Sequence, residues 1–251
     1  MGGAFVDGML NGSIFQSADI TVANPTEKKL ERFAMKGASV TTDNKVAATG
    51  ADIVSVFVKP WLLEGVIKEI KGELDYRRQK LVVCAAGIKA TQIKEWLDKG
   101  DNTLPPIFLV IPNTAIAVKA SMTFIVPVGA TAEETRLIAS IFDDLGESIV
   151  TEERLLGAGT TLASCGIAYA MRYIRAASEG GVELGFRAAD AQRIVQQTVK
   201  GAVELLQANG THPEQEIDKV TTPGGLTIKG LNEMEHAGFT SAVVRGLKAG
   251  L

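Results

Sequence analysis

The chain has 251 residues, of which 46% are hydrophobic and 22% charged, and its formal net charge is −3. This length allows one large domain or two modest ones. The slightly acidic balance excludes the basic surface typical of proteins that bind nucleic acid or anionic membranes, and no apolar run approaches the roughly 20 residues of a membrane span.

The first 150 or so residues alternate short apolar runs with helical patterns. The run at 53–58 is almost entirely apolar, which is typical of a parallel strand buried on both faces. The alternation predicts an α/β fold with an open, doubly wound, mostly parallel sheet. Strands are expected at 18–23, 39–41, 53–58, 80–85, 108–111, 122–126 and 148–151, and helices at 26–36, 45–49, 61–70, 91–97 and 133–145.

After about residue 152 the strand patterns stop. Helical patterns follow at 155–177, with a soft break near Gly166, and at 187–207, 214–220, 227–236 and 240–250. We therefore predict a dinucleotide-binding domain over 1–152 and an all-α domain over 153–251. The second domain has more apolar surface than a thin bundle can bury alone, which favours a homodimer formed through it.

Cysteines and histidines are few. Cys84 and Cys165 sit in apolar surroundings without metal-ligand spacing, and no signal peptide pattern opens the chain. We expect reduced thiols and a cytoplasmic protein. His212 and His236 lie in polar segments and are interpreted as surface residues, so we expect no metal site.

The segment 218–231 carries the strongest local signal. Thr222 is predicted to cap a helix and Pro223 to lie in its first turn, while Gly224 and Gly225 leave the backbone bare. Unpaired N–H groups at such a helix start attract carboxylates and phosphates. An ordinary capped turn would explain the same residues equally well.

Three predicted strand ends carry residues compatible with a ligand. They are Val58-Lys59-Pro60, Cys84-Ala85-Ala86-Gly87 and Pro112-Asn113-Thr114. In an open α/β sheet, ligands lie beyond the carboxyl ends of the strands. Each segment alone is also consistent with a solvated loop or a tight turn, but three in succession predict a cofactor site.

The end of the second predicted strand distinguishes NAD from NADP. An acidic residue there would bind the ribose hydroxyls and repel a 2′-phosphate. The sequence instead has Asn24, Thr26 and two lysines near this position. The pattern favours NADPH, with NADH as the alternative.

Together these segments resemble the pyrroline-5-carboxylate reductase family. The C-terminal one matches the family pattern V-[ST]-[ST]-P-G-G-x-T-x-x-[GA]-L, and the strand ends match [AF]-V-K-P, [CS]-A-A-G and [MI]-P-N-T-P. The start, Met1-Gly2-Gly3-Ala4, is similar to the end of the family's glycine loop, G-x-G-N-M-G-G-A. The chain departs from the family at Leu226, Ala115, Cys165 and Ile167.

The resemblance implies a Rossmann-like domain, followed by a helical domain that binds substrate and dimerises. It also implies hydride transfer from NADPH to the cyclic imine 1-pyrroline-5-carboxylate, which gives L-proline. Relatives form dimers that assemble further, often as pentamers of dimers. The first strand and earlier glycines are absent from this sequence, so we expect either a truncated chain or a start at an internal methionine of a longer gene.

The resemblance also suggests roles for individual residues. The Thr227 hydroxyl is expected near the ring nitrogen as the catalytic group, and Glu153 near the substrate, although a solvated carboxylate is its alternative. The other substrate-binding candidates are Thr222, Gly225 and Leu226. The strand ends and the resemblance together give as cofactor-binding candidates Met1, Gly2, Asn24, Asn44, Val58, Lys59, Pro60, Ala86, Gly87 and Asn113.

Two other interpretations remain. One is another imine or β-hydroxyacid reductase, which would use a lysine of the helical domain as acid, with Lys200 as the candidate. That lysine has Glu204 four residues on, where such enzymes have asparagine. The other is a non-catalytic relative.

Overall fold

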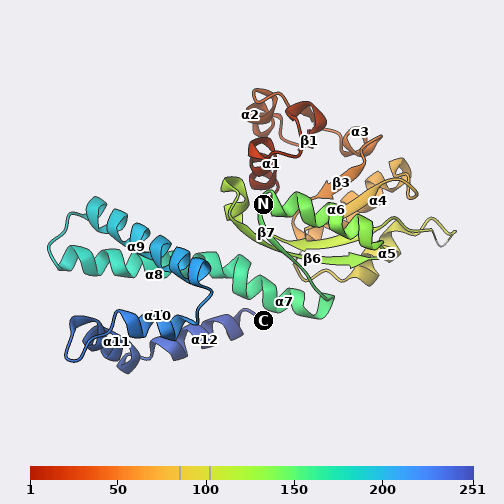
Figure 1. The fold of residues 1–251 in the computed structure, drawn as a ribbon. Helices are drawn as coiled ribbons and strands as arrows, with labels where there is room; N and C mark the ends of the chain where they lie inside the picture. Colours follow the sequence, from red (N-terminus) through yellow and green to blue (C-terminus); the bar gives the residue numbers. More distant parts are fainter. Residues whose placement is uncertain (85, 102) are drawn as a thin grey trace. The chain divides into compact units, whose positions relative to one another are not determined.

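The computed structural model describes residues 1–84, 86–101 and 103–251. The chain forms two compact units, Met1–Cys165 and Gly166–Leu251 (Figure 1). Strands occur only in the first unit, so the described residues agree with the expectation that strands stop near residue 152. The division into units falls a little later in the chain than the predicted domain boundary.

The strands of the first unit form two sheets. Strands β1 (Thr21–Ala23) and β2 (Ser39–Thr41) make a parallel pair. The larger sheet has the order β3 (Ile53–Val56), β4 (Lys80–Val83), β5 (Ile107–Ile111), β6 (Ser121–Val128) and β7 (Gly146–Val150). Neighbouring strands in it are parallel, except that β6 runs antiparallel to β5. The prediction of a mostly parallel sheet is therefore confirmed.

The division into two sheets can be compared with the doubly wound strand order 3-2-1-4-5-6. In that order the first strand lies between the second and the fourth, which correspond to β1 and β3. Among the described residues, β3 is paired only with β4 and β1 only with β2. The structure thus has the arrangement expected of a Rossmann-like sheet without its first strand.

Helices of the first unit fall close to the predicted ranges, except that α1 (Gly2–Asn11) lies before the first of those ranges and that one predicted helix is broken. The pattern at 26–36 forms a 3₁₀ turn (Glu27–Lys29) and a short α2 instead of one helix. The predicted strand at 18–23 likewise begins as a 3₁₀ turn (Ser17–Asp19), because the Asp19 carboxylate accepts the Gln16 N–H at 2.8 Å and holds the turn. The α-helices are α1 (Gly2–Asn11), α2 (Glu31–Ala34), α3 (Asn44–Ala48), α4 (Pro60–Ile70), α5 (Ala90–Leu97) and α6 (Ala132–Asp143).

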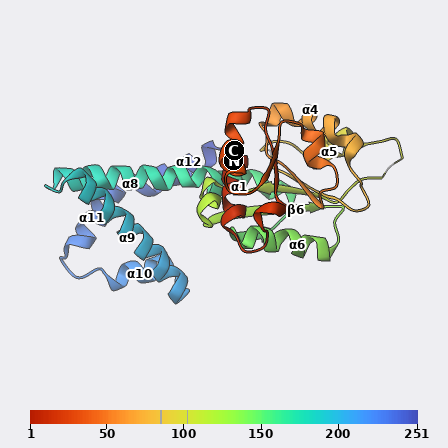
Figure 2. The same cartoon turned by 90° about the horizontal axis from the view of Figure 1, so that it is seen from above.

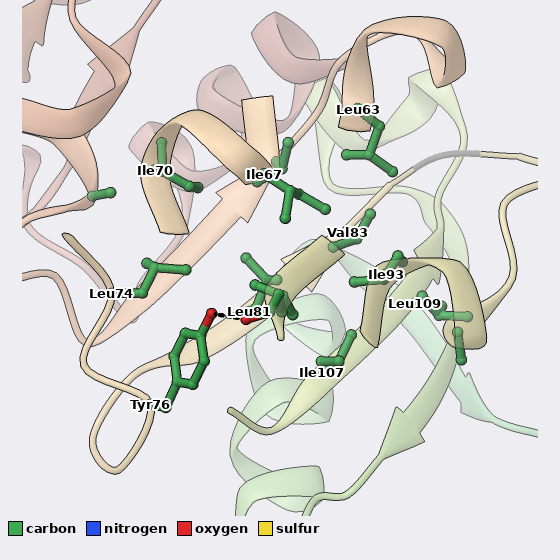
Figure 3. Close-up of a cluster of buried hydrophobic side chains, with 14 of the residues drawn as sticks. Leu63, Ile67, Ile70, Leu74, Tyr76, Leu81, Val83, Ile93, Ile107 and Leu109 are labelled. Atoms are coloured by element: carbon green, nitrogen blue, oxygen red, sulfur yellow. Dashed lines mark hydrogen bonds between the residues drawn. The ribbon is translucent and has the colours of Figure 1, made fainter. Parts of the chain in front are cut away.

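Side-chain alternation along β4 and β5 divides the core into two layers. Leu81 and Val83 pack against α4 and α5, whereas Val82 between them packs against α1 and α6. Figure 2 shows α4 and α5 on one side of β6 and α6 on the other. Figure 3 shows the first layer, where Leu63 and Ile67 of α4 lie over the strands. Because successive side chains point to opposite faces, an apolar strand with no polar alternation is buried on both sides. The predicted end of β4 at residue 85 lies outside the described residues.

The second unit is entirely helical. The segment predicted as one helix at 155–177 begins as α7 (Leu156–Gly159) in the first unit and passes through a π-helical stretch (Thr160–Cys165) into α8 (Gly166–Glu183). The predicted break near Gly166 is therefore the end of the π-helix. The remaining helices are α9 (Ala188–Asn209), α10 (Pro213–Lys219), α11 (Leu226–His236) and α12 (Phe239–Ala249). Of all the described residues in this unit, only Ala191 is buried.

Close packing of α1 on the turn Thr114–Val118 depends on Gly8. A Cβ at Gly8 would lie 2.4 Å from the carbonyl oxygen of Ile116. We expect Gly8→Ala to lower the free energy of unfolding by about 1–3 kcal/mol, because backbone must move to admit the methyl group. Gly65→Ala is the matched control. It lies in α4 with open space around it, and should raise the free energy of unfolding by about 0.5–1 kcal/mol. Urea unfolding of both variants checks this, and a neutral Gly8→Ala would contradict it.

Candidate functional site

The start of α1 lies beside the ends of β3 and β4. A Cβ at Gly2 would be 3.1 Å from Cβ of Phe57, the residue after β3 that precedes Val58. The amino group of Met1 is close enough to Cys84, at the end of β4, to influence its pKa. No side chain caps α1, so its first N–H groups are free to meet an anion. This corner matches the place where a doubly wound fold binds a pyrophosphate.

Cys84 forms an apolar wall of this corner. Its thiol is partly buried, and burial raises the pKa of Cys84 to about 12, although the charge of the Met1 amino group partly offsets this effect. The thiol is therefore protonated at neutral pH. Cys84 is suited to packing and not to nucleophilic chemistry.

The loop after β4 includes Ala86 and Gly87 and leads into α5. Gly87 has a φ of +80°, a left-handed conformation that favours glycine. At the far end of the loop, the backbone N–H of Ala90 donates to Oε1 of Glu153 at 2.9 Å. Glu153 therefore contacts the first residue of α5, directly after the loop that carries two of the candidate cofactor-binding residues. No sequence signal indicates this hydrogen bond, because the two residues are 63 positions apart.

Three candidate asparagines already take part in local hydrogen bonds. Asn24 Oδ1 accepts the Thr26 N–H at 3.0 Å in the turn after β1, and Asn44 Nδ2 donates to Glu69 Oε2 at 3.0 Å. Asn113 is buried, and its Oδ1 accepts the Ala115 N–H at 2.9 Å. Asn24 and Asn113 thus hold the backbone after a strand, whereas Asn44 links α3 to α4 through its side chain. Their contacts with a cofactor stay predictions.

The end of β3 presents a cation and an aromatic ring together. Lys59 is the N-cap of α4 and Pro60 its first residue, as the helix preference of proline predicts. Lys59 Nζ lies 5.9 Å from the ring centroid of Trp61, whose side chain is 76% exposed. The sequence analysis did not single out Trp61, although its position directly after Lys59-Pro60 brings an aromatic ring to this strand end.

In the helical unit, residues 222–225 form a turn that precedes α11. The Gly225 N–H donates to the Thr222 carbonyl at 3.0 Å, and Gly224 has a φ of +70°. Proline followed by glycine in this conformation is typical of a type II turn. The prediction that Thr222 caps the helix is wrong, because left-handed backbone at Gly224 cannot belong to an α-helix. The helix begins at Leu226, with Gly225 as its N-cap.

The start of α11 still has the properties predicted for an anion site. No side chain caps it, so backbone N–H groups of its first turn are available. Thr227 is the second helical residue and its side chain is exposed. Leu226, the first helical residue, is 89% exposed. A helix start of this kind suits a carboxylate or a phosphate.

Neither a metal site nor a membrane span is found in the part of the chain that the structure describes. No group of three or more histidine, cysteine or acidic residues is placed to hold a metal ion. His212 Nδ1 instead accepts the Glu214 N–H at 3.2 Å and caps α10. No described helix combines the length and apolar character that crossing a membrane requires.

A Rossmann-like sheet with a helix start at the ends of its strands, followed by an all-α unit, is typical of a class of dinucleotide-dependent oxidoreductases. Residues 1–87 match the family model described as NADP oxidoreductase, coenzyme F420-dependent. Residues 153–251 match the model described as pyrroline-5-carboxylate reductase dimerisation.

Similar proteins agree with this class. Pyrroline-5-carboxylate reductase 1 of Dictyostelium discoideum is 38% identical over 98% of this chain, which covers 46% of that relative. Pyrroline-5-carboxylate reductase 2 of the same organism is 35% identical, with 98% of this chain and 86% of that protein covered. The chain belongs to the pyrroline-5-carboxylate reductase family. This places it among the NAD(P)H-dependent oxidoreductases that act on CH–NH groups.

Solved structures show the same fold. The pyrroline-5-carboxylate reductase of Coxiella burnetii has a TM-score of 0.88 at 26% identity, covering 98% of this chain and 91% of that one. The pyrroline carboxylate reductase of Plasmodium falciparum, crystallised with NADP bound, has a TM-score of 0.87 at 23% identity, with 98% and 90% covered. The second likeness concerns the fold alone.

The protonation state of Cys84 is open to test by alkylation. In a Cys165→Ser variant, we expect iodoacetamide at neutral pH to label Cys84 roughly a hundred- to thousandfold more slowly in the folded protein than in urea. The folded pKa of about 12 lies above the unfolded value of about 8.5, so the thiol stabilises the fold below the unfolded pKa. That contribution is lost as the pH rises towards the folded pKa. Equal labelling rates in the two states would contradict the assignment.

Proposed function

We propose that the chain transfers a hydride from NADPH to 1-pyrroline-5-carboxylate and so forms L-proline, the last step of proline biosynthesis. The observation that carries the proposal is the uncapped start of α11 behind the 222–225 turn, in a chain of this family. NADPH supplies the hydride when bound. The chain's own residues then have to bind the substrate anion, orient the ring and allow a proton to reach its nitrogen.

The substrate carboxylate is proposed to bind at the α11 start. Backbone N–H groups of Leu226 and Thr227 and the hydroxyl of Thr222 are the proposed donors. Gly225 would contact the carboxylate without donating to it, because its N–H is engaged with the Thr222 carbonyl. A helix N-terminus favours an anion through both its unpaired N–H groups and its dipole. Holding the carboxylate in one orientation presents a single face of the imine to the cofactor, which is the main requirement for a stereospecific reduction.

Thr227 is proposed to donate a hydrogen bond from its hydroxyl to the ring nitrogen. An imine is basic enough to arrive protonated or to accept a proton from water, so no strong acid is required. Thr227 is exposed at the helix start, and its side chain makes no hydrogen bond with the described residues. Its hydroxyl can therefore turn towards a ligand and relay a proton from water.

The cofactor is proposed to lie along the corner formed by α1 and the ends of β3, β4 and β5. The fit rests on the uncapped α1 start beside Phe57 and on the open backbone at Gly87. The adenosine side would lie towards Asn24 and Asn44. The turn after β1 contains Lys28 and Lys29, which favour the 2′-phosphate of NADPH over the bare ribose of NADH. The candidate contacts are Met1, Gly2, Asn24, Asn44, Val58, Lys59, Pro60, Ala86, Gly87 and Asn113.

The rival reductase mechanism depends on Lys200 as an acid. In the structure the Lys200 side chain is 66% exposed and lies 3.6 Å from Glu204 in an ion pair on one face of α9. A solvated ion pair of this kind is ordinary helix surface. The structure thus favours Thr227 over Lys200 as the group that assists the imine.

Two substitutions separate these mechanisms. Thr227→Ala should lower kcat/KM for 1-pyrroline-5-carboxylate about 10- to 100-fold, the range expected for losing a hydrogen bond to a charged group. Lys200→Ala, the matched control in the same unit, should leave kcat/KM unchanged. The loss of NADPH absorbance with the imine as substrate measures both. An unchanged Thr227→Ala removes this residue from the role, and a chain inactive in every form supports a non-catalytic relative.

A homodimer through the helical unit is proposed as the basic assembly. This unit buries only one of its described residues, while large apolar side chains are exposed on α8, α9 and α12. Such a surface is costly in water and is typical of obligate interfaces. Further assembly into a pentamer of dimers stays a prediction. We propose the cytoplasm as its location, because both cysteines are free thiols.

A charge introduced among the exposed apolar side chains of α9 should disrupt the homodimer. Ile194 on α9 is 44% exposed, and we expect Ile194→Asp to shift the protein from dimer towards monomer in sedimentation velocity. The control is Val118→Asp in the first unit, where Val118 is 74% exposed and should leave the dimer intact. Equal sedimentation coefficients of the two variants would argue against a dimer interface that includes Ile194.

A further inference from the structure

Glu153 contacts a part of the structure far from it in sequence. It is the first residue of the 3₁₀ turn Glu153–Leu155, shortly after β7, and its side chain is half-buried. Its Oε1 accepts the backbone N–H of Ala90, the first residue of α5, at 2.9 Å. The flanking residues Glu152 and Arg154 are exposed and pair with each other. Of these three charged side chains, Glu153 is the one that is bonded to the start of α5.

The hydrogen bond from Ala90 to Glu153 satisfies a backbone N–H group at the start of α5. The N-cap of α5 is Lys89, whose side chain has no atom that can accept a hydrogen bond. Gln92 reaches back to the Lys89 N–H at 3.0 Å, which leaves the Ala90 N–H to Glu153. A carboxylate here also interacts favourably with the positive end of the helix dipole.

The same two segments are joined by apolar contact. Leu156, just after the turn that carries Glu153, packs against the core layer formed by α4 and α5. Ile88, in the loop between Gly87 and Ala90, packs against that same layer, and so does Val58 at the end of β3. One hydrogen bond and a shared apolar layer therefore hold the loop 86–89 against the segment that begins at Glu153.

We propose that Glu153 is a positioning residue for the cofactor loop. By fixing the Ala90 N–H, it sets where Ala86 and Gly87 present their backbone, and it does so before any cofactor binds. The inference rests on the proposed course of the cofactor along these residues. It gives Glu153 a different role from the direct substrate contact expected from the family resemblance, because its carboxylate is already engaged with α5.

The first measurement is amide hydrogen exchange on the whole chain without cofactor. In Glu153→Ala, peptides covering 86–93 should exchange on the order of tenfold faster, because the hydrogen bond that holds the start of α5 is lost. In Glu153→Gln the side-chain oxygen still accepts the bond, so most of the protection should return. Peptides in α11 should be unchanged in both variants.

The second measurement is the affinity for NADPH, followed by nucleotide fluorescence. Glu153→Ala should weaken binding about 3- to 10-fold, whereas KM for the imine should stay the same. Glu152→Ala is the matched control, a neighbouring carboxylate that is exposed and does not touch the loop, and it should change neither value.

A third variant removes the donor and keeps Glu153. Ala90→Pro deletes the N–H at the first helical position, where proline is well tolerated and where the preceding Lys89, with φ −88° and ψ 151°, already has suitable backbone. It should weaken NADPH binding as much as Glu153→Ala does, and the double variant should be no weaker than either. This keeps the test valid if Glu153→Ala alone folds poorly.

Each of these measurements either supports or overturns the positioning role of Glu153. A raised KM for the imine with unchanged NADPH affinity would show that Glu153 contacts substrate, and it would overturn the positioning role. Unchanged exchange at 86–93 in Glu153→Ala would overturn it as well. These outcomes are distinct from failure of the proposed function, which would be seen as no imine-dependent NADPH oxidation in the unsubstituted protein, while the exchange measurement remains readable.

Discussion

Burial of β5 on both faces is the constraint on which the first unit depends. All five residues of Ile107–Ile111 are buried, with alternate side chains in the two core layers. A strand in this position cannot carry a polar side chain along its length without leaving that group unsatisfied. Around β5 and the neighbouring β4, polar and flexible residues therefore gather where the strands end. There they cap helices, as Asn113 does, or open the backbone, as Gly87 does.

The helical unit, in contrast to the sheet, leaves most of its apolar side chains unburied. Its helices are amphipathic, but the described residues bury almost none of their apolar side chains within the unit, with Ala191 as the exception. Packing α8 against α9 covers only a part of each helix. The remaining apolar surface gives this unit a strong thermodynamic reason to associate, since oligomerisation removes from water what the single chain cannot. Association and folding of this unit are thus closely linked.

Much of the fold was predictable because its signals are local and strong. Apolar runs such as 53–58 and 108–111 identified buried strands, and amphipathic patterns identified α6 and α9. The antiparallel direction of β6 was not predictable, because the turn Thr114–Val118 that reverses the chain has no distinctive pattern. The Thr222 cap was predicted wrongly, since proline and glycine suit both a helix start and a type II turn, and only the φ of Gly224 decides between them. The Glu153–Ala90 bond joins residues too distant for any local pattern.

The turn at 222–225 has a consequence for how this protein tolerates change. Donors at the start of α11 belong to the main chain, so they persist whichever side chain occupies each position, provided that the turn forms. Leu226 illustrates this, because its bulky side chain is exposed while its backbone begins the helix. Substitutions that keep the turn therefore leave these donors in place. Only substitutions that alter the backbone of the turn, above all at Gly224 with its positive φ, would redirect them.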